Sequence, residues 1–433
     1  MPKDKEQYVL FDARALPVRI ALIAAVILAL IFGWFAVRWQ LGNMLAELTA
    51  ITSPNAQSVA RLATDFAPRD PLANWLFANT ETDPLTPAKL SGSIKSFEKI
   101  VRLSPYDFQW WIELGRAREQ AEDLTGAEKA YVRAVEIAPN YTYPHWQLGN
   151  FYLRQDKPDE AFSELKKSAE TSGLYREQVF SIAWDYYEQD TARIERLMGD
   201  SPAVKAGLAK YYAGKERAAD SLRIWNLLSD EEKQTNAPVA KIIAQALYEK
   251  RFFRQAVEFV RQIGIETNAK AETVQNGDFE KPLADANENY FGWNISSISK
   301  MDVKPDPTKK HEGSRSLRVS FNGFTDPTLF NISQYVVVEA GVKYQLSFWL
   351  RAENLRSAGM PLLEINNAND DRGIVTTKPF PTEQKDWQQF KLTFTAPQNA
   401  EAIYIRTARD YCGADCPIFG TFWYDDFKLE KIK

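Results

Sequence analysis

The sequence predicts a multidomain protein with a transmembrane helix, an all-α solenoid of helical repeats and an all-β sandwich, in that order. Three observations lead to this fold class. Residues 20–37 form an apolar run without a charge, residues 55–265 repeat a helical pattern at a 34-residue step, and the sequence after Val274 alternates with a period of two. A chain of 433 residues is also long enough for about three domains of ~150 residues each.

The composition excludes several classes of function. The chain has 53 Lys and Arg residues against 57 Asp and Glu residues, and this near balance is unlike a sequence-independent nucleic-acid binder. Its two histidines leave little material for histidine-based metal binding or nucleophilic catalysis, and its two cysteines cannot form a four-ligand zinc site. We therefore expect no nucleic acid among its partners.

The first element is the apolar run itself. Residues 20–37 read IALIAAVILALIFGWFAV between Arg19 and Arg38, without the polar residues at helical spacing that a soluble core helix would have. At ~1.5 Å per residue this helix is ~27 Å long, close to the ~30 Å hydrocarbon core of a bilayer. A cleaved signal peptide is the alternative, but its apolar region usually spans ~7–15 residues. The sequence therefore predicts a transmembrane helix over residues 20–38.

Cationic residues on either side of this helix predict its orientation. Arg38 is the only Lys or Arg between the apolar run and Arg61. The cations that precede the run are Lys3, Lys5, Arg14 and Arg19. The positive-inside rule then keeps residues 1–19 in the cytoplasm and places the rest of the chain across the membrane. In a bacterium this would be a single-pass inner-membrane protein with its bulk in the periplasm.

The two cysteines bear on the same compartment. Cys412 and Cys416 lie in the sequence CGADC, and the oxidising periplasm would allow them to close a small disulfide loop. Two free thiols are the alternative, because a disulfide needs Cα atoms within ~7 Å and the sequence does not give that distance.

Residues 55–265 contain the helical repeats. One register is formed by Trp111, Leu114, Gly115, Ala127, Tyr131, Ala134 and Pro139, and the next, 34 residues later, by Leu148, Gly149, Tyr152, Ala161 and Leu165. This pattern resembles the tetratricopeptide repeat, W-x-x-L-G-x-x-Y followed by A-x-x-x-F-x-x-A and Pro. Its small residues let the two helices of a repeat approach closely, and its proline ends the second helix. With weaker matches on both sides, we expect about five to six repeats.

The resemblance implies a solenoid whose extended surface holds a peptide or another protein. The first helix of each repeat would line this surface. In the second clear repeat the residues at the groove-facing positions are Tyr143, Trp146, Asn150 and Arg154. Asn150 matches the position at which some members of the family hold a peptide carboxylate with an asparagine. The alternative is that Tyr143 and Trp146 pack between repeats or on the next helix.

Residues 266–273 form a linker, and residues 274–433 are predicted to form an all-β domain rich in Thr, Ser, Asn, Gly and Pro. The predicted strands include 317–321, 332–338, 344–352, 390–395, 402–408 and 421–430. About seven or eight short strands separated by turns are typical of an antiparallel sandwich.

Several motifs in this segment occur in the order found in a known family. They are VQNGDFE at 274–280, GW at 292–293, HEGSRSLRV at 311–319, AGVKYQLSFWLRA at 340–352 and YDDFKL at 424–429. Together they resemble carbohydrate-binding modules of the galactose-binding-like jelly-roll class. The resemblance implies a jelly-roll sandwich, and the class also has members that bind proteins or lipids or only cap a larger molecule.

Side-chain alternation along the strands separates core residues from surface residues. The side chains expected in the core are Tyr344, Leu346, Phe348, Leu350, Leu363, Ile365, Ile403 and Ile405. Modules of this class bind glycans on a concave sheet, with an aromatic ring and polar groups. The residues of the opposite strand faces that would supply them are Trp349, Arg351, Glu364, Asn366, Tyr404 and Arg406. The alternative is that a loop or the repeat domain covers Trp349.

The resemblance also implies a structural calcium ion, held in many such modules by the Glu of the N-terminal motif and an Asp of the last strand. The matching residues are Glu280 and Asp425. We expect Asp425 to share a face with Phe427 and Leu429, and a buried carboxylate needs a cation or several hydrogen-bond donors. Backbone hydrogen bonds to Asp425 are therefore the alternative to calcium.

We expect no enzymatic activity. His145 and His311 have structural explanations, one in a repeat helix and one before a strand. The sequence contains no Gly-rich phosphate loop after a strand, no G-x-S-x-G and no H-E-x-x-H. A carboxylate pair for glycoside hydrolysis stays open, because the separation of two carboxylates in space is invisible in the sequence.

The function that combines these elements is a membrane-anchored periplasmic scaffold. Its repeats would dock protein partners and its sandwich would bind glycan, in cell-envelope polysaccharide assembly or export. The alternative is a purely protein-binding envelope assembly factor whose sandwich is a structural cap.

Overall fold

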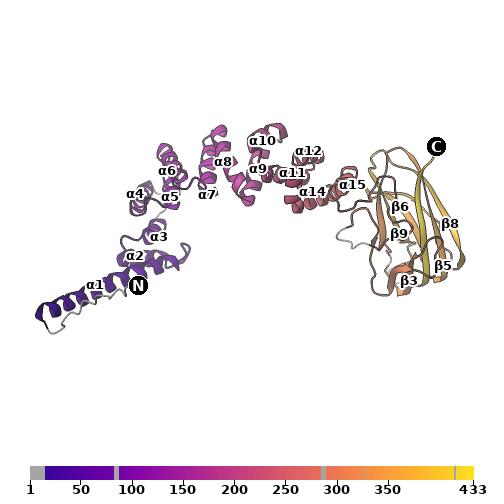
Figure 1. Cartoon of the computed structure of the whole chain (residues 1–433), viewed down its shortest axis with the longest axis horizontal. Helices are drawn as coiled ribbons and strands as arrows, with labels where there is room; N and C mark the ends of the chain where they lie inside the picture. Colours follow the sequence, from indigo (N-terminus) through magenta and orange to yellow (C-terminus); the bar gives the residue numbers. More distant parts are fainter. Residues whose placement is uncertain (1–14, 82–86, 284–288, 327, 414–415) are drawn as a thin grey trace, which may run out of the picture. The chain divides into compact units, whose positions relative to one another are not determined.

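The computed structural model describes residues 15–81, 87–283, 289–326, 328–413 and 416–433 (Figure 1). Most of the predicted cytoplasmic segment 1–19 lies outside the described residues. The chain divides into two compact units, Met1–Gly199 and Asp200–Lys433.

The described part of the first unit is helical throughout. Its helices are α1 (Leu16–Glu47), α2 (Ala56–Phe66), α3 (Pro71–Glu81), α4 (Pro87–Leu103), α5 (Phe108–Gln120), α6 (Leu124–Ile137), α7 (Thr142–Arg154), α8 (Pro158–Thr171), α9 (Gly173–Tyr186) and α10 (Thr191–Met198). Polar residues begin several of them. The side chains of Asp107 and Asp123, for example, accept hydrogen bonds from the free backbone N–H groups at the starts of α5 and α6.

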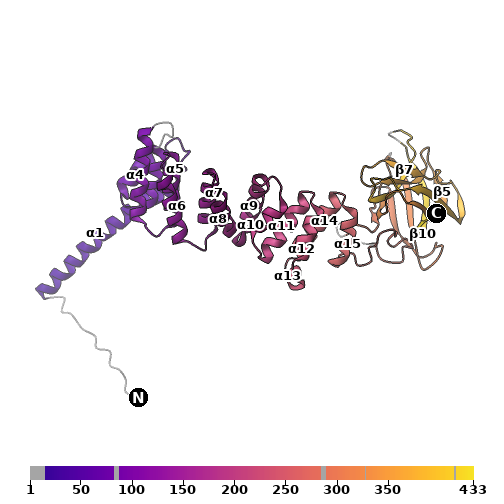
Figure 2. The same cartoon turned by 90° about the horizontal axis from the view of Figure 1, so that it is seen from above.

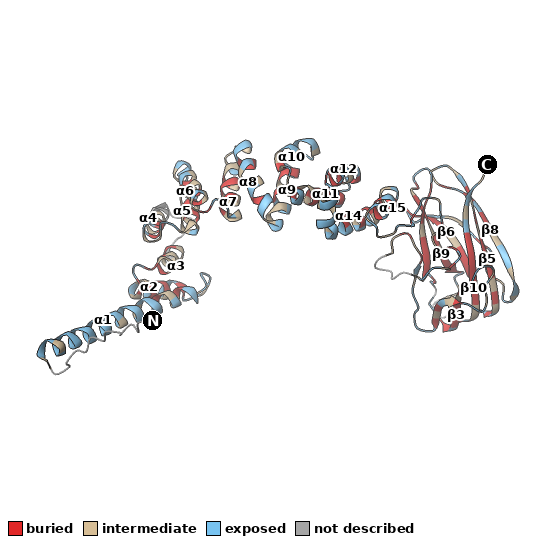
Figure 3. Ribbon diagram, in the orientation of Figure 1, coloured by how far each residue is buried: buried red, intermediate tan, exposed pale blue. Residues whose placement is uncertain are grey.

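Helix α1 is longer than the predicted transmembrane helix and is uninterrupted in both views (Figure 1 and Figure 2). Its apolar part is exposed, and the helix is long and apolar enough to cross a membrane by length and composition (Figure 3). Beyond Arg38 the same helix packs on α2 and α3. Gly42 permits this contact, because a Cβ atom there would lie 2.7 Å from the carbonyl oxygen of Ala63. Asn43 donates a hydrogen bond of 3.1 Å to Asp70 at the start of α3.

The helices that follow form pairs, consistent with the predicted repeat solenoid. The turns inside the pairs carry residues with positive φ, at Glu122, Asp156, Gln189, Glu216 and Arg251. The step from Glu122 to Asp156 is the 34 residues that the sequence pattern predicts. The predicted close approach is present as well, because a Cβ atom on Gly149 would lie 2.7 Å from Cγ of Leu165.

The second unit joins further helices to a β-sandwich. The helices are α11 (Pro202–Gly214), α12 (Ala218–Asn226), α13 (Asp230–Thr235), α14 (Ala237–Glu249) and α15 (Phe253–Gln262). The strands are β1 (Asn294–Ile295), β2 (Met301–Asp306), β3 (Ser316–Phe324), β4 (Ile332–Val337), β5 (Lys343–Arg356), β6 (Pro361–Asn367), β7 (Gly373–Thr376), β8 (Gln384–Thr395), β9 (Ala402–Arg409) and β10 (Ile418–Lys431).

Two antiparallel sheets form the sandwich, as predicted. The first, called sheet A here, has the order β1-β4-β9-β6-β7, and the second, sheet B, has the order β2-β3-β10-β5-β8. The core lies between them, and the predicted core residues from Tyr344 to Ile405 are all buried. Phe348 of β5 is at the centre, stacked on Phe427 at 4.9 Å between ring centroids and on Phe390 at 5.4 Å.

The strand register corrects the expectation for Asp425. Asp425 lies opposite Trp349, on the outer face of sheet B, whereas Phe427 faces the core. A β-bulge between Asp425 and Lys428, with Asp426 at φ 49°, shifts the alternation. Asp425 therefore does not share a face with Phe427 and Leu429, and strict alternation gave the wrong side for this carboxylate.

The close helix contacts lead to a first prediction. Gly149→Ala should lower the free energy of unfolding by about 1–3 kcal/mol, because the added methyl group overlaps Leu165 and the α8 backbone at Ala161. Gly214→Ala is the matched control, since a Cβ atom there meets nothing within 4 Å and alanine favours a helix. Thermal unfolding followed by circular dichroism measures both, and equal effects would contradict the packing role of Gly149.

Candidate functional site

The outer face of sheet A brings together four of the predicted glycan-binding residues. Glu364 lies opposite Arg406, and Asn366 lies opposite Tyr404, on the neighbouring strands β6 and β9. Arg406 donates a hydrogen bond from Nε to the carboxylate of Glu364. Its guanidinium group also lies 3.8 Å from the ring centroid of Phe330, which is 42% exposed. This face thus combines aromatic rings with a paired charge.

Strand β4 adds an aromatic residue to this face that the sequence analysis missed. Tyr335 lies opposite Tyr404, and the two rings stack with centroids 4.4 Å apart. Burial, with a smaller effect of the neighbouring Tyr404, raises the pKa of Tyr335 to about 12, so its hydroxyl stays protonated. Alternation in the predicted strand 332–338 places Tyr335 on the face that points away from the core. The sequence of this strand alone could therefore have identified Tyr335 as an outward-facing residue.

The other two predicted residues are not part of this face. Trp349 and Arg351 lie on β5, which belongs to sheet B, between β10 and β8. The six predicted residues therefore do not form one site, because β5 and β6 are consecutive in sequence but lie in different sheets. Arg351 forms an ion pair with Glu353 at 2.6 Å.

A loop covers Trp349, which is the alternative left open by the sequence. His311 stacks on the indole ring with centroids 3.9 Å apart, and Trp387 packs edge-on against His311 at 6.0 Å. The loop, residues 307–315, is called the covering loop below. Because His311 occupies a face of the indole ring, Trp349 does not offer a free stacking surface there.

Carboxylates on both sides fix the covering loop. Glu280 accepts hydrogen bonds from the N–H groups of Ser314 at 2.7 Å and Arg315 at 3.1 Å, and donors from Ser314 lower its pKa. Asp425 accepts hydrogen bonds from the N–H groups of His311 at 2.8 Å and Asp426 at 2.9 Å. Asp425 thus makes the backbone hydrogen bonds that were the alternative to calcium.

Glu280 and Asp425 carry carboxylate oxygens, which are the kind of ligand that a hard cation binds. Burial raises the pKa of Asp425 to about 7, despite the hydrogen bond from His311, and a nearby cation would favour its charged form. Carboxylate oxygens are also the ligands that calcium prefers. A further group of atoms that could hold a metal ion, from His311, Glu312 and Asp426, lies within 4.8 Å of one another.

A third carboxylate, Asp306, is the last residue of β2, directly before the covering loop, and is buried. It accepts hydrogen bonds from the Thr308 N–H at 2.8 Å, the Thr308 hydroxyl at 2.6 Å and the Trp423 indole N–H at 2.9 Å. Burial alone would raise the pKa of Asp306, but these hydrogen bonds outweigh it and lower the pKa to about 2.

Helices α14 and α15 cover part of sheet A. Phe253 stacks on Tyr335 at 5.2 Å between ring centroids, and Tyr248 meets Tyr335 edge-on at 5.5 Å. Tyr248 also packs against Tyr290 and Phe291, and this burial raises its pKa. The end of the sheet A face that carries Tyr335 and Tyr404 is called the aromatic end below. The chain's own helices thus occupy it.

The predicted groove residues of α7 have different roles in the structure. Trp146 packs on Tyr175 of α9 at 5.1 Å between ring centroids, and Asn150 donates a hydrogen bond to the Trp146 carbonyl oxygen within its own helix. The Tyr143 hydroxyl accepts a hydrogen bond of 2.6 Å from Arg116. Tyr143 and Trp146 thus contact neighbouring helices, which was the alternative to groove binding.

Arg154 lines a cavity of about 380 Å³ together with Arg116, Glu119, Gln120, Tyr131 and Gln147. Arg154 holds Glu119 with two hydrogen bonds of 2.6 and 3.0 Å, and Arg116 forms an ion pair with Glu113 at 2.9 Å. Arg116 precedes Asn150 by one 34-residue step, so the repeat pattern points to this basic residue, which the sequence analysis missed.

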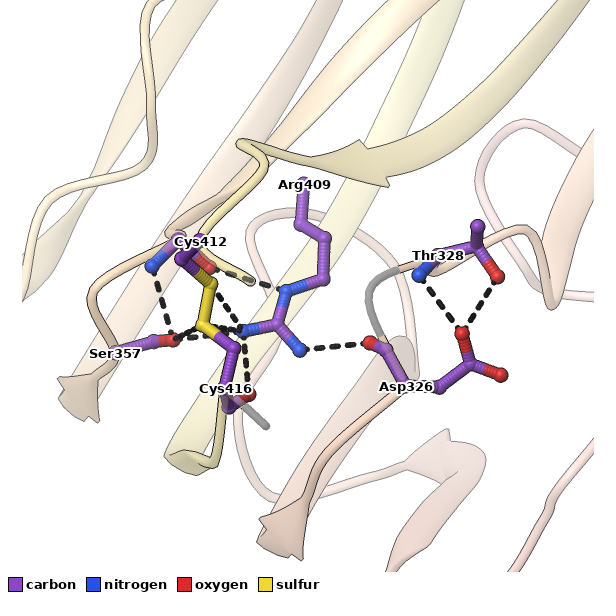
Figure 4. The surroundings of a disulfide bond; sticks show 7 residues. Asp326, Thr328, Ser357, Arg409, Cys412 and Cys416 are labelled. Carbon is purple, nitrogen blue, oxygen red and sulfur yellow. Dashed lines mark hydrogen bonds between the residues drawn. A yellow bond between two sulfur atoms is a disulfide. The ribbon is translucent and has the colours of Figure 1, made fainter. Parts of the chain in front are cut away.

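Cys412 and Cys416 are paired in a disulfide, with Cα atoms 5.8 Å apart (Figure 4). The guanidinium group of Arg409 lies against this bond. It donates hydrogen bonds to the Cys416 carbonyl oxygen at 2.9 Å, the Ser357 hydroxyl at 2.7 Å and the Asp326 carbonyl oxygen at 2.9 Å. The buried side chain of Arg409 thus joins the disulfide loop to two other loops of the sandwich. Burial lowers the pKa of Arg409.

Comparison with known proteins supports the assignment of the β-domain. Residues 271–410 match the family model described as a carbohydrate binding domain. No curated protein matches the chain.

Solved structures similar to parts of the chain include three of different kinds. A structure titled "CBM4 structure and function" is 17% identical, covers 37% of this chain and 99% of its own, and has a TM-score of 0.27. TmCBM61 in complex with β-1,4-galactotriose is 18% identical, covers 38% of this chain and 100% of its own, with a TM-score of 0.25. MamA from Desulfovibrio magneticus RS-1 is 22% identical, covers 31% of this chain and 73% of its own, with a TM-score of 0.25.

The hydrogen bonds of Asp306 predict a pH dependence. Because its folded pKa lies below the usual 3.8, its contribution to stability is present above about pH 4 and is lost as the pH falls towards 2. Asp306→Asn should therefore lower the free energy of unfolding by about 2 kcal/mol at neutral pH and by much less near pH 2. Urea unfolding at both pH values measures this, with the exposed Asp386→Asn as control. A pH-independent difference would contradict the role of the charge.

Proposed function

We propose that the protein is a membrane-anchored, non-catalytic adaptor that binds glycan with its β-sandwich and protein partners with its helix pairs. The observation that carries this proposal is the carbohydrate-binding family match over residues 271–410. A bacterial chain with this arrangement would act in the periplasm, in the assembly or export of a cell-envelope polysaccharide.

The glycan is proposed to bind on the outer face of sheet A, around Arg406, Glu364 and Phe330. Arg406 and Glu364 present a guanidinium group and a carboxylate, which bind sugar hydroxyls by charge-assisted hydrogen bonds. The exposed ring of Phe330 beside Arg406 supplies an apolar surface for the C–H face of a sugar. Ligand sites commonly combine apolar walls with a few polar groups in this way.

Protein or peptide partners are proposed to bind the helix pairs, which resemble tetratricopeptide repeats. The cavity between Arg116 and Arg154 supports a polar contact there. Because each arginine is already paired with a glutamate, a partner would have to exchange ion pairs rather than meet a free cation.

The membrane anchor is proposed to remain on the mature protein. Removal of a signal peptide behind the apolar run would cut α1, whose last part packs on α2 and α3 through Gly42 and Asn43. Arg38 donates a hydrogen bond of 2.7 Å to the Asp65 carbonyl oxygen, which adds a further tie. The distribution of cations then favours a cytoplasmic N-terminus.

A purely protein-binding assembly factor is the second candidate. The observation that favours it is that Tyr248 and Phe253 cover the aromatic end of sheet A. In this case the sandwich would be a structural cap on the last helix pair.

Glycan-array binding by the full chain in detergent separates the two candidates. If the proposed site is right, Arg406→Ala should weaken binding by about tenfold or more, because a charged hydrogen-bond donor to the sugar is lost. Trp349→Ala, on the other sheet, should leave binding within about twofold and is the matched control. Absence of binding to every glycan would support the cap, and loss of binding only in Trp349→Ala would place the site on sheet B.

We also propose a structural calcium ion at the covering loop, with Glu280 and Asp425 among its ligands. The raised pKa of Asp425 supports this, since calcium would relieve the cost of its buried charge. Calcium should raise the melting temperature of the wild type in chelator-treated buffer, and should not do so for Asp425→Asn. An unchanged wild-type melting temperature would reject a tight calcium site.

A further inference from the structure

The last helix pair, α14 and α15, contacts sheet A at Tyr335, and the role inferred for this contact rests on the proposed glycan-binding function. Tyr335 is stacked on both sides, by Tyr404 at 4.4 Å and by Phe253 at 5.2 Å between ring centroids. Both stacked pairs are close to parallel, with interplanar angles of 23° and 21°. A sugar ring could stack on the Phe253 side of Tyr335 only by displacing that side chain.

Polar contacts at the rim hold the helices in this position. Arg251 donates hydrogen bonds to the Ala368 carbonyl oxygen at 2.9 Å and to Asp371 at 2.8 Å. Arg254 donates to the Val338 carbonyl oxygen at 3.2 Å, and its backbone N–H donates to Glu401 at 3.2 Å. The side chains of Arg251 and Asp371 are 39% and 62% exposed, and exposed ion pairs of this kind contribute little stability.

The chain between the helices and the sandwich allows the contact to open. Helix α15 ends at Gln262, and from Glu266 onward the chain is fixed to the sandwich. Glu266 accepts hydrogen bonds from the N–H groups of Tyr290 and Phe291, and the Glu272 N–H donates to the Val337 carbonyl oxygen at 2.8 Å. Gly264 lies between these parts with φ 79° and open space around it. The Ile265 and Glu266 N–H groups donate to the Val260 carbonyl oxygen of α15 at 3.0 and 3.3 Å, so a change of backbone angle at Gly264 would break these two hydrogen bonds as it separates the helices from the sheet.

We infer that α15 and glycan compete for the aromatic end of sheet A, so that the helix pair inhibits glycan binding in the closed state. Phe253 takes the place of a sugar ring on Tyr335, and the two arginines hold it there. Anything that draws α15 away, such as a partner bound to the helix pairs, then increases the affinity for glycan. If the closed state predominates, the observed affinity is reduced by the fraction of open molecules.

The test weakens the rim contacts and leaves the stacked rings intact. The variant is Arg251→Asn combined with Arg254→Ala, in which asparagine is chosen because Arg251 has φ 64° and asparagine tolerates positive φ. The matched control is Lys250→Ala, which removes an exposed ion pair to Glu216 within the helices. The probes are linear β-1,4-linked oligosaccharides of glucose, xylose, mannose and galactose, titrated against the full chain in detergent.

The double variant should bind the preferred oligosaccharide about fivefold more tightly than the wild type, and the control should be unchanged. Hydrogen–deuterium exchange of α15 and β4 should be faster in the double variant, and saturating oligosaccharide should accelerate exchange of α15 in the wild type. Tyr404→Ala should weaken binding in both backgrounds.

Two results would overturn the inference and leave the glycan-binding proposal standing. In the first, the wild type binds an oligosaccharide, and the double variant exchanges faster than the wild type but does not bind more tightly. The other is wild-type binding with no change of exchange in the double variant. If neither form binds any probe although exchange shows that the contact has opened, glycan binding by this face fails, and the inference fails with it.

Discussion

The packing of aromatic rings between the two sheets determines which side chains the β-sandwich presents to its surroundings. Phe348 stacks on Phe390 and Phe427, and full burial of one such side chain contributes roughly 2–3 kcal/mol. Because alternate residues of β5 face this core, Trp349 has to face outward. The same constraint on β9 and β6 turns Arg406 and Glu364 outward together. The positions of the candidate ligand-binding residues therefore follow from the burial of the core.

This constraint explains how much the sequence could predict. Periodicity identified the helical region, the β-domain and the core faces of β5, β6 and β9, because these features depend on neighbouring residues. It failed at Asp425, where the bulge at Asp426 shifts the alternation. It also grouped Trp349 with Tyr404, since the order of strands in a sheet depends on pairing between distant segments. The extension of α1 to Glu47 was missed because only its apolar part gives a strong signal.

Long-range contacts also decide which candidate surfaces are free. Trp349 was predicted correctly to face outward, but His311 stacks on its ring. The ring of Tyr335 faces outward as well, and Phe253 lies on it. In both cases the covering residue lies more than thirty positions away in sequence, so a local pattern cannot reveal the contact. Of the predicted glycan surface, Glu364, Asn366, Tyr404 and Arg406 do lie together on the adjacent strands β6 and β9.

The continuity of α1 has a mechanical consequence. A flexible linker would let α2 and α3 rotate freely relative to the apolar part of the chain, but α1 runs without a break from that part into its contact with α2 and is therefore a stiff connection. If the apolar part is embedded in a bilayer, as proposed, its tilt is transmitted directly to α2 and α3. The proposed anchor would thereby hold α2 and α3 at a fixed distance from the bilayer.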